Sequence, residues 1–395
     1  ARAAREWPAA EALVISGRRL DYRTLEQGAH AVARALRASG IGHGDHVAVC
    51  MGNAVEWVQF FYGAAIVGAV TVPVNTRFKT DELAYCLKQA DVKLLLTVDR
   101  FLKIDFIAML RQVCPALDAQ LPDAALPLLR EVVVLGDEVP RGAINHVDWL
   151  ARGAAAPAAA GAPVSPDDVL LMQFTSGTTS YPKGVMLTHD NMLRNAACVA
   201  PRFDCRAGDR YYSARPFYHV AGTTLSMLAA LSCGATLLSS PSFEPGEALR
   251  LMAAERCTVT SGNDDLGVMD DDGRLRFLTR VKDVFRVGGE NVAPAEVEDA
   301  LNRHPAIKQA QVIGVPDARM GEVGAAYVIL NPGMSATPDD IIAWSRERMA
   351  NFRVPRYVRI VDTFEHIGMT GSAKVQKNKL RAYALEDLGL GTAKA

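Results

Sequence analysis

Apolar strands alternate with helices through the first hundred residues, and this alternation restricts the fold more than any other feature of the chain. The stretch Val47-Ala48-Val49-Cys50-Met51 is apolar throughout, as expected of a strand buried on both faces. Repeated strand–helix units build parallel sheets that helices cover on both sides. The aromatic helix 56–68 fits this core. We predict an α/β fold with further strands at 11–15, 70–74 and 93–98.

A further predicted strand, 169–172, runs into a loop that is rich in small and hydroxyl residues. The run from Gln173 to Gly184 contains five Ser or Thr residues, and Pro182-Lys183-Gly184 closes it. Small residues let backbone N–H groups approach an anion, hydroxyls add donors, and a lysine neutralises charge. A solvated linker is the alternative, but the preceding strand favours phosphate binding. The candidate phosphate ligands are Thr175, Ser176, Gly177, Thr178, Thr179 and Lys183.

This run differs from the ordinary P-loop, which places Ser or Thr directly after Gly-Lys. It resembles instead the signature loop of the AMP-forming acyl-CoA synthetases, in the adenylate-forming ligase superfamily. The resemblance implies that these residues bind ATP and AMP. It extends from about residue 5 to residue 382, with one departure here, since Ser180 replaces the usual Gly.

A second motif, Arg215 to Gly222, follows the predicted strand 211–214. A lone histidine beside aromatics is usually structural, but α/β sheets bind ligands at the carboxyl ends of strands. The motif resembles the family's acyl-binding region. The resemblance implies that His219 binds the carboxylate and acts in catalysis, and that Phe217, Tyr218, His219 and Gly222 line the acyl pocket. A helix is expected over 223–233.

After Cys257 the family pattern is interrupted. The next motif begins by Asp265, whereas the family has a segment of roughly one domain, on the order of a hundred residues, between the two stretches. That segment carries the adenine pocket and a Mg²⁺-binding Glu. We therefore expect an internal segment to be missing near 257–265, either deleted from the protein or omitted from the sequence. The metal ligands remain unknown.

The pattern then resumes. Asp265 resembles the family's ribose-binding Asp, although the acidic run 264–272 also fits a solvated turn. Arg280 is implied to bind the ribose and Lys282 to act as the hinge. Thr279 stands where the family has Gly. The expected domains are 1–281, which binds AMP and the acyl group, and 282–395, a small mobile α+β domain.

In the small domain, strands are expected at 284–287, 310–315, 325–330 and 357–361, with a turn over 316–324. The resemblance places coenzyme A at Gly288 and Gly289. It also makes Lys374, in Thr370 to Lys377, the catalytic lysine that bridges carboxylate and α-phosphate. The alternative is that the lysines of this segment form only a basic tail, the commoner meaning of such a run. Ala373 again replaces a family Gly.

Net charge and cysteine usage limit the possible partners and the cellular compartment of the protein. A net charge of −1 argues against nucleic-acid partners, and seven cysteines without a C-x-x-C pair fit reduced thiols. No apolar run has the length of a membrane span, and no signal peptide is visible. We expect a cytoplasmic protein, with a homodimer as an alternative to a monomer. The chain begins without Met inside a predicted helix, so we expect native residues before Ala1.

The resemblance implies an ATP-dependent acyl-CoA ligase that uses ATP, Mg²⁺ and coenzyme A and acts on a fatty or other hydrophobic acid. Two alternatives stay open. One is a deleted homologue of weak or no activity that binds nucleotide, acyl ligand or a protein. The other is an adenylation domain that loads a carrier protein.

Overall fold

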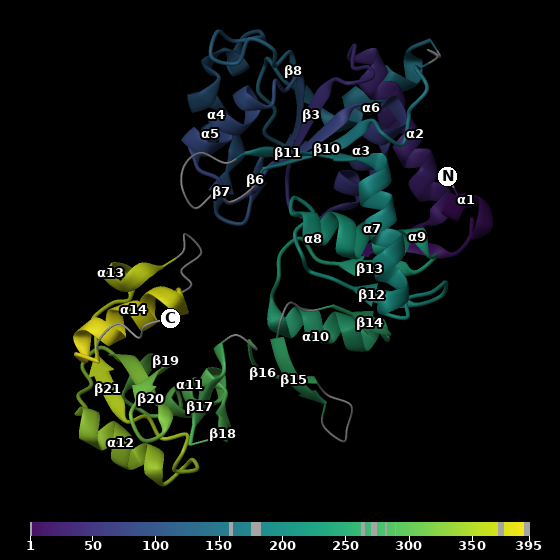
Figure 1. Cartoon of the computed structure of the whole chain (residues 1–395). Helices are drawn as coiled ribbons and strands as arrows, with labels where there is room; N and C mark the ends of the chain where they lie inside the picture. The colour runs from purple at the N-terminus through teal and green to yellow at the C-terminus, as the bar shows by residue number, and fades with distance from the viewer. Residues whose placement is uncertain are drawn as a thin grey trace. The chain divides into compact units, whose positions relative to one another are not determined.

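The computed structural model divides the chain into two compact units, Ala1–Ser261 and Gly262–Ala395 (Figure 1). It describes residues 2–157, 161–174, 183–261, 283–288, 290–369 and 375–390, and the backbone of 265–269 and 275–280. The domain boundary expected at 281/282 stays a prediction.

The larger sheet of unit 1 has seven strands. In sheet order the strands are β11 (Gly184–Thr188), β10 (Val169–Phe174), β4 (Val70–Pro73), β3 (His46–Cys50), β5 (Leu94–Val98), β8 (Glu131–Leu135) and β9 (Ile144–Asn145). Adjacent strands in this sheet are parallel, except for one antiparallel pair, β10 with β11, at the edge. The parallel sheet predicted from the apolar strands is therefore confirmed.

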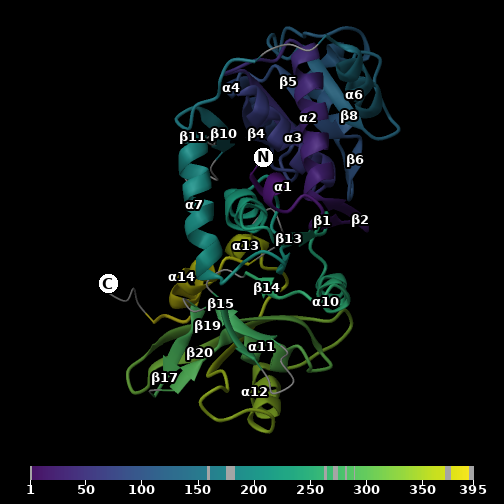
Figure 2. The same cartoon turned by 90° about the vertical axis from the view of Figure 1, so that its right-hand side faces the viewer.

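Two hydrophobic cores cover the opposite faces of this sheet. In β3, Val47 and Val49 belong to one core, while Ala48 and Cys50 belong to the other. This alternation follows from the two-residue period of a strand. The first core holds α2 (Tyr22–Ala38), which packs against α3 (Val55–Val67) and α6 (His146–Ala155) (Figure 2). The second holds α4 (Thr80–Gln89), α5 (Phe106–Val113) and the short helix Pro115–Asp118.

Helix α2 shows why these segments fold as predicted. Asp21 caps its N-terminus by accepting a hydrogen bond from Thr24 N at 2.7 Å. The helix ends at Ser39-Gly40, where Gly40 has a φ of 72°. Its buried face includes Leu25, Val32 and Leu36.

A five-stranded sheet completes unit 1. Its strands are β14 (Val259–Thr260), β12 (Arg210–Tyr212), β13 (Thr236–Ser239), β1 (Glu11–Ile15) and β2 (Arg18–Asp21). Only the β1–β2 pair is antiparallel. Outside the two large sheets, β6 (Arg100–Phe101) pairs with β7 (Ile104–Asp105).

The helices beside the five-stranded sheet are α1 (Arg2–Glu6), α7 (His189–Arg202) and α10 (Pro245–Ala254). The helix expected over 223–233 is present to Ser232, as a π-helix over Thr223–Leu228 followed by α9 (Ala229–Ser232), and the short α8 (Val220–Gly222) directly precedes it. Hydroxyl side chains bond backbone here, since Thr223 Oγ1 donates to Phe217 O at 2.6 Å and Ser226 Oγ to Ala221 O at 3.2 Å. Such bonds compete with the regular helical pattern.

Unit 2 contains a hairpin and a five-stranded sheet with its own core. The hairpin is β15 (Asp265–Met269) with β16 (Leu275–Arg280). The sheet comprises β17 (Phe285–Val287), β18 (Glu290–Val292), β19 (Ile307–Asp317), β20 (Gly321–Leu330) and β21 (Tyr357–Ile360). The helices are α11 (Pro294–Leu301), α12 (Pro338–Arg346), α13 (Glu365–Gly368) and α14 (Lys377–Asp387). This mixture confirms the predicted small α+β part.

The turn expected over 316–324 is shorter than predicted. Strands β19 and β20 pair as far as Asp317 and Gly321. Asp317 Oδ1 accepts from Arg319 N at 3.0 Å and Met320 N at 2.8 Å, so the side chain closes the turn within three residues. Across the described parts of both units, no helix is long and apolar enough to span a membrane.

Candidate functional site

The signature run joins two paired strands. It begins at the end of β10 and returns at Gly184 in β11, so that Phe174 and Gly184 are register partners. Strand β11 leads directly into α7. Lys183 is described and exposed. The other phosphate candidates, Thr175, Ser176, Gly177, Thr178 and Thr179, lie outside the described residues.

The acid loop, defined here as Arg215 to His219, follows β12. It lies beyond the carboxyl end of that strand, where α/β sheets bind ligands. Phe217 is completely buried, with its ring centroid 5.4 Å from that of Trp57. This packing anchors the loop in the core. The predicted contact between Phe217 and an acyl group stays a prediction.

His219 presents a hydrogen-bond donor from this loop. Its Nδ1 atom accepts from Ala221 N at 3.1 Å, so in the neutral ring the proton is assigned to Nε2. Desolvation by surrounding atoms, together with the positive charge of Arg215, lowers the pKa of His219. A neutral Nε2–H group suits donation to a carboxylate oxygen.

Gly222 has a packing reason to be glycine. A Cβ atom at this position would lie 2.1 Å from Pro216 O. Gly222 N donates to His219 O at 2.9 Å, which closes the loop on itself. Gly222 therefore shapes the loop by close backbone approach, and its predicted contact with the acid stays a prediction.

Two carboxamides that the sequence interpretation did not single out as binding residues hold the acid loop. Asn53 lies in the turn after β3, and its Oδ1 accepts from Phe217 N at 2.8 Å. Gln173, the first residue of the signature run, donates from Nε2 to Tyr218 O at 3.1 Å. The only sequence signal for Asn53 was its place directly after an apolar strand, in Gly52-Asn53.

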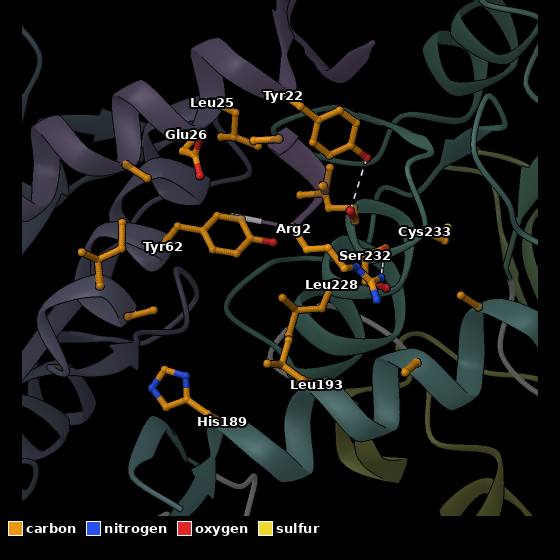
Figure 3. Close-up of a pocket in the computed structure, with 18 of the residues that line it drawn as sticks. Arg2, Tyr22, Leu25, Glu26, Tyr62, His189, Leu193, Leu228, Ser232 and Cys233 are labelled. Atoms are coloured by element: carbon orange, nitrogen blue, oxygen red, sulfur yellow. Dashed lines mark hydrogen bonds between the residues drawn. The ribbon is translucent and has the colours of Figure 1, made fainter. Parts of the chain in front are cut away.

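A largely apolar cavity of about 770 Å³ lies elsewhere in unit 1, between α2, α3, α7 and α9 (Figure 3). Tyr62, Leu193 and Leu228 are among its lining side chains. None of the predicted site residues that the structure describes lines it. The sequence interpretation assigned the aromatic helix 56–68 to the core, which holds for Trp57 and Phe61, whereas Tyr62 borders this cavity.

In unit 2, the structure pairs the two predicted ribose ligands in register. Asp265 in β15 lies opposite Arg280 in β16. Gly288 adopts a φ of 58°, a conformation that favours glycine, and its N donates to Met320 O at 2.9 Å. Gly289, Lys282 and Lys374 lie outside the described residues.

Among the described residues, no group of three or more His, Cys, Asp or Glu side chains is arranged to hold a metal ion. Magnesium usually binds through substrate phosphates with one or two carboxylates. The predicted use of Mg²⁺ stays a prediction.

Comparison with known families identifies the class. The family model of the AMP-binding enzymes matches residues 1–309, and that of the AMP-binding enzyme C-terminal domain matches residues 296–374. The chain therefore belongs to the AMP-binding enzymes, the adenylate-forming acyl-CoA ligases that the motifs indicated. The fold agrees with the crystal structure of the anthranilate CoA ligase AuaEII, at a TM-score of 0.66 and 19% identity over 98% of this chain and 97% of that one.

A relative that this chain matches over nearly its whole length is longer than this chain. The YngI protein of Bacillus subtilis, which carries the name acyl-CoA synthetase, is 28% identical over 98% of this chain and 96% of its own length. That alignment spans 535 positions, whereas this chain has 395 residues in all. The chain is thus shorter than its relative, as a missing segment requires. The position of the gap near 257–265 stays a prediction.

Proposed function

We propose that the protein is an ATP-dependent acyl-CoA ligase that activates a fatty or other hydrophobic carboxylic acid. The observation that carries this proposal is the bond from Ala221 N to His219 Nδ1, which assigns the ring N–H to Nε2, in a loop that Gln173 ties to the strand entering the signature run. A side chain that donates a hydrogen bond to a carboxylate, beside a loop that binds phosphate, suits a site that joins a carboxylate to a nucleotide.

The names of relatives support a hydrophobic acid. A feruloyl-CoA synthase of an Amycolatopsis species is 25% identical over 96% of this chain and 97% of its own. A mitochondrial medium-chain acyl-CoA ligase of Mus musculus is 25% identical over 98% and 87%. Both named acids carry an apolar body on one carboxylate.

In the first half-reaction, a carboxylate oxygen of the acid attacks the α-phosphorus of ATP, and the bond to pyrophosphate breaks. His219 orients the carboxylate, while Lys183 and Lys374 neutralise the anions that meet. Asp265 and Arg280 hold the ribose. The threonines, serine and glycine of the signature run donate hydrogen bonds to the phosphates.

In the second half-reaction, the thiol of coenzyme A attacks the acyl carbon and AMP leaves with the electron pair of the broken bond. Gly288 and Gly289 contact the pantetheine arm. Rotation about Lys282 exchanges Lys374 for the glycine loop between the two steps. A cytoplasmic location and a homodimer remain part of this proposal.

Intact mass followed by an activity assay tests the proposal. The mass first establishes whether the purified chain is 42.6 kDa or contains a further segment. Pyrophosphate release is then measured against fatty and aromatic acids, with His219→Ala as control. Acid-dependent release that His219→Ala lowers supports the proposal. Release that is absent with every acid, or independent of acid, contradicts it.

The second candidate is a homologue that binds acyl or nucleotide ligands without turnover. The shorter length of this chain relative to YngI favours it, as do Ser180, Thr279 and Ala373, where the family has glycine. Calorimetric binding of the acid or ATP without pyrophosphate release would select this candidate.

A further inference from the structure

We propose that Asn53 and Gln173 are positioning residues for His219. Together the two amides fix the position of His219, which donates to the carboxylate of the acid, relative to the strand that enters the signature run. We call this pair the amide clasp. The inference deepens the proposed function and rests on it for the role of His219 toward the acid. The contacts that define the clasp stand independently of that role.

Asn53 uses all of its hydrogen-bonding groups in this task. Oδ1 accepts from Phe217 N at 2.8 Å, and Nδ2 donates to Arg215 O at 2.9 Å and to Ser239 Oγ at 3.0 Å. The residue is only 2% exposed. A buried amide that is satisfied at both ends fixes its partners, because breaking either bond strands a buried polar group.

Gln173 holds the next part of the loop. Its Nε2 donates to Tyr218 O at 3.1 Å. Asn53 and Gln173 thus bond backbone groups of Arg215, Phe217 and Tyr218, three of the four residues before His219. Among the described residues no donor reaches Gln173 Oε1, although that atom is buried. Because Gln173 is the first residue of the signature run, its Oε1 atom lies at the start of the loop that we propose binds phosphate.

The clasp joins two different sheets. Asn53 follows β3 and Gln173 lies in β10, both in the seven-stranded sheet, whereas the acid loop follows β12 of the five-stranded sheet. Hydrophobic packing fixes the approximate distance between the sheets but does not specify individual backbone groups. The two directional amides supply that specification.

The constraint reaches the His219 ring through short local bonds. His219 N donates to Pro216 O at 3.0 Å, in the middle of the clasped segment. Thr223 Oγ1 donates to Phe217 O at 2.6 Å and to His219 O at 3.2 Å. With Ala221 N on Nδ1, the ring has a defined orientation and tautomer. Releasing Phe217 and Arg215 loosens the segment that carries all of these bonds.

The test compares Asn53→Ala, Gln173→Leu and the double variant in the full chain. The first readout is the tautomer of His219, taken from ¹⁵N shifts of histidine-labelled protein and assigned with His219→Gln. We expect the Nε2–H form to dominate in the parent and to give way to mixed tautomers in Asn53→Ala. The second readout is kinetic. KM for the acid should rise about tenfold, while KM for ATP changes less than twofold.

Asn145→Ala is the matched control. Asn145 also ties backbone, accepting from Val147 N at 2.8 Å and donating to Gly136 O at 3.3 Å, but at the β9 edge of the sheet. An unchanged His219 tautomer in Asn53→Ala and in the double variant overturns the clasp. So does the same spectral change in Asn145→Ala, which would mark general loosening.

The two proposals fail separately. If no variant or parent releases pyrophosphate, the ligase function fails while the tautomer readout still decides on the clasp. If turnover is present but Asn53→Ala raises KM for ATP as much as KM for the acid, the clasp fails as a positioning device for the carboxylate while the ligase function stands.

Discussion

The Sγ atoms of Cys205 and Cys233 lie 3.5 Å apart, between the end of α7 and the end of α9. Both thiols line the apolar cavity of unit 1. The hydrogen bond with Cys205 lowers the pKa of Cys233, because a thiolate gains from a neighbouring donor. Burial acts in the opposite direction on Cys257, whose pKa is raised to about 11.

Cys233 should therefore be alkylated faster than Cys257 at neutral pH, since the thiolate is the nucleophile. Iodoacetamide labelling followed by peptide mapping measures both rates in one sample. Cys205→Val, which removes the donor, should slow labelling of Cys233, whereas Cys205→Ser keeps a donor and should slow it less. Equal rates for Cys233 in these two variants would refute the explanation.

Gly222→Ala should destabilise unit 1, because the added Cβ would meet the backbone oxygen of Pro216 at 2.1 Å. Overpacking of this kind costs about 1–3 kcal/mol of unfolding free energy. Urea unfolding followed by fluorescence measures the change. Gly42→Ala is the control, since a Cβ at Gly42 meets nothing within 4 Å and its φ is not positive. Matching losses in the two variants would show that steric contact is not the cause.

The stability of unit 1 should depend on Glu255 in acid. Its hydrogen bond with Arg19, and then that with Arg210, lower the pKa of Glu255 below its ordinary 4.5. A carboxylate with a lowered folded pKa contributes stability that is complete above the unfolded pKa and is lost as the pH falls through the folded one. Arg19→Gln should therefore lose less unfolding free energy than the parent between pH 6 and pH 3.

Arg194→Gln provides the comparison for this pH series, because Arg194 forms an exposed i,i+4 pair with Asp190 in α7. Exposed pairs contribute little. The acid-induced loss of stability of Arg194→Gln should therefore be closer to the parent's than that of Arg19→Gln. A pH profile of Arg19→Gln that coincides with the parent's would exclude the proposed linkage.

Lys374→Ala should slow acyl-adenylate formation by about 100-fold, the typical loss when one charge-stabilising group is removed. Thioester formation from preformed acyl-adenylate should be spared, because the proposed hinge rotation removes Lys374 before that step. Stopped-flow assays of the two half-reactions separate them. Lys379→Ala is the matched control in the same basic segment. Equal loss in both half-reactions would disprove the assignment of Lys374.

Local pattern was enough to predict the sheets but not the contacts between them. The apolar runs in β3 and β5 indicated buried parallel strands, and the structure confirms them. The bond from Phe217 N to Asn53 spans 164 residues, and nothing in either segment alone specifies it. The short turn after Asp317 depends on where one carboxylate points. The π-helix over Thr223–Leu228 includes hydroxyl side chains that bond the backbone, which hydrophobic periodicity does not register.

The burial of β3 on both faces has a practical consequence. Its amides, from Val47 to Cys50, lie between β4 and β5 with a core on either side. Such amides exchange with solvent deuterium only when the whole unit opens. A ligand that binds the folded unit lowers the population of the open form in proportion to its occupancy. Deuterium uptake in the peptide that contains β3 should therefore measure the affinity of any acid or nucleotide bound by unit 1, even in a chain that turns nothing over.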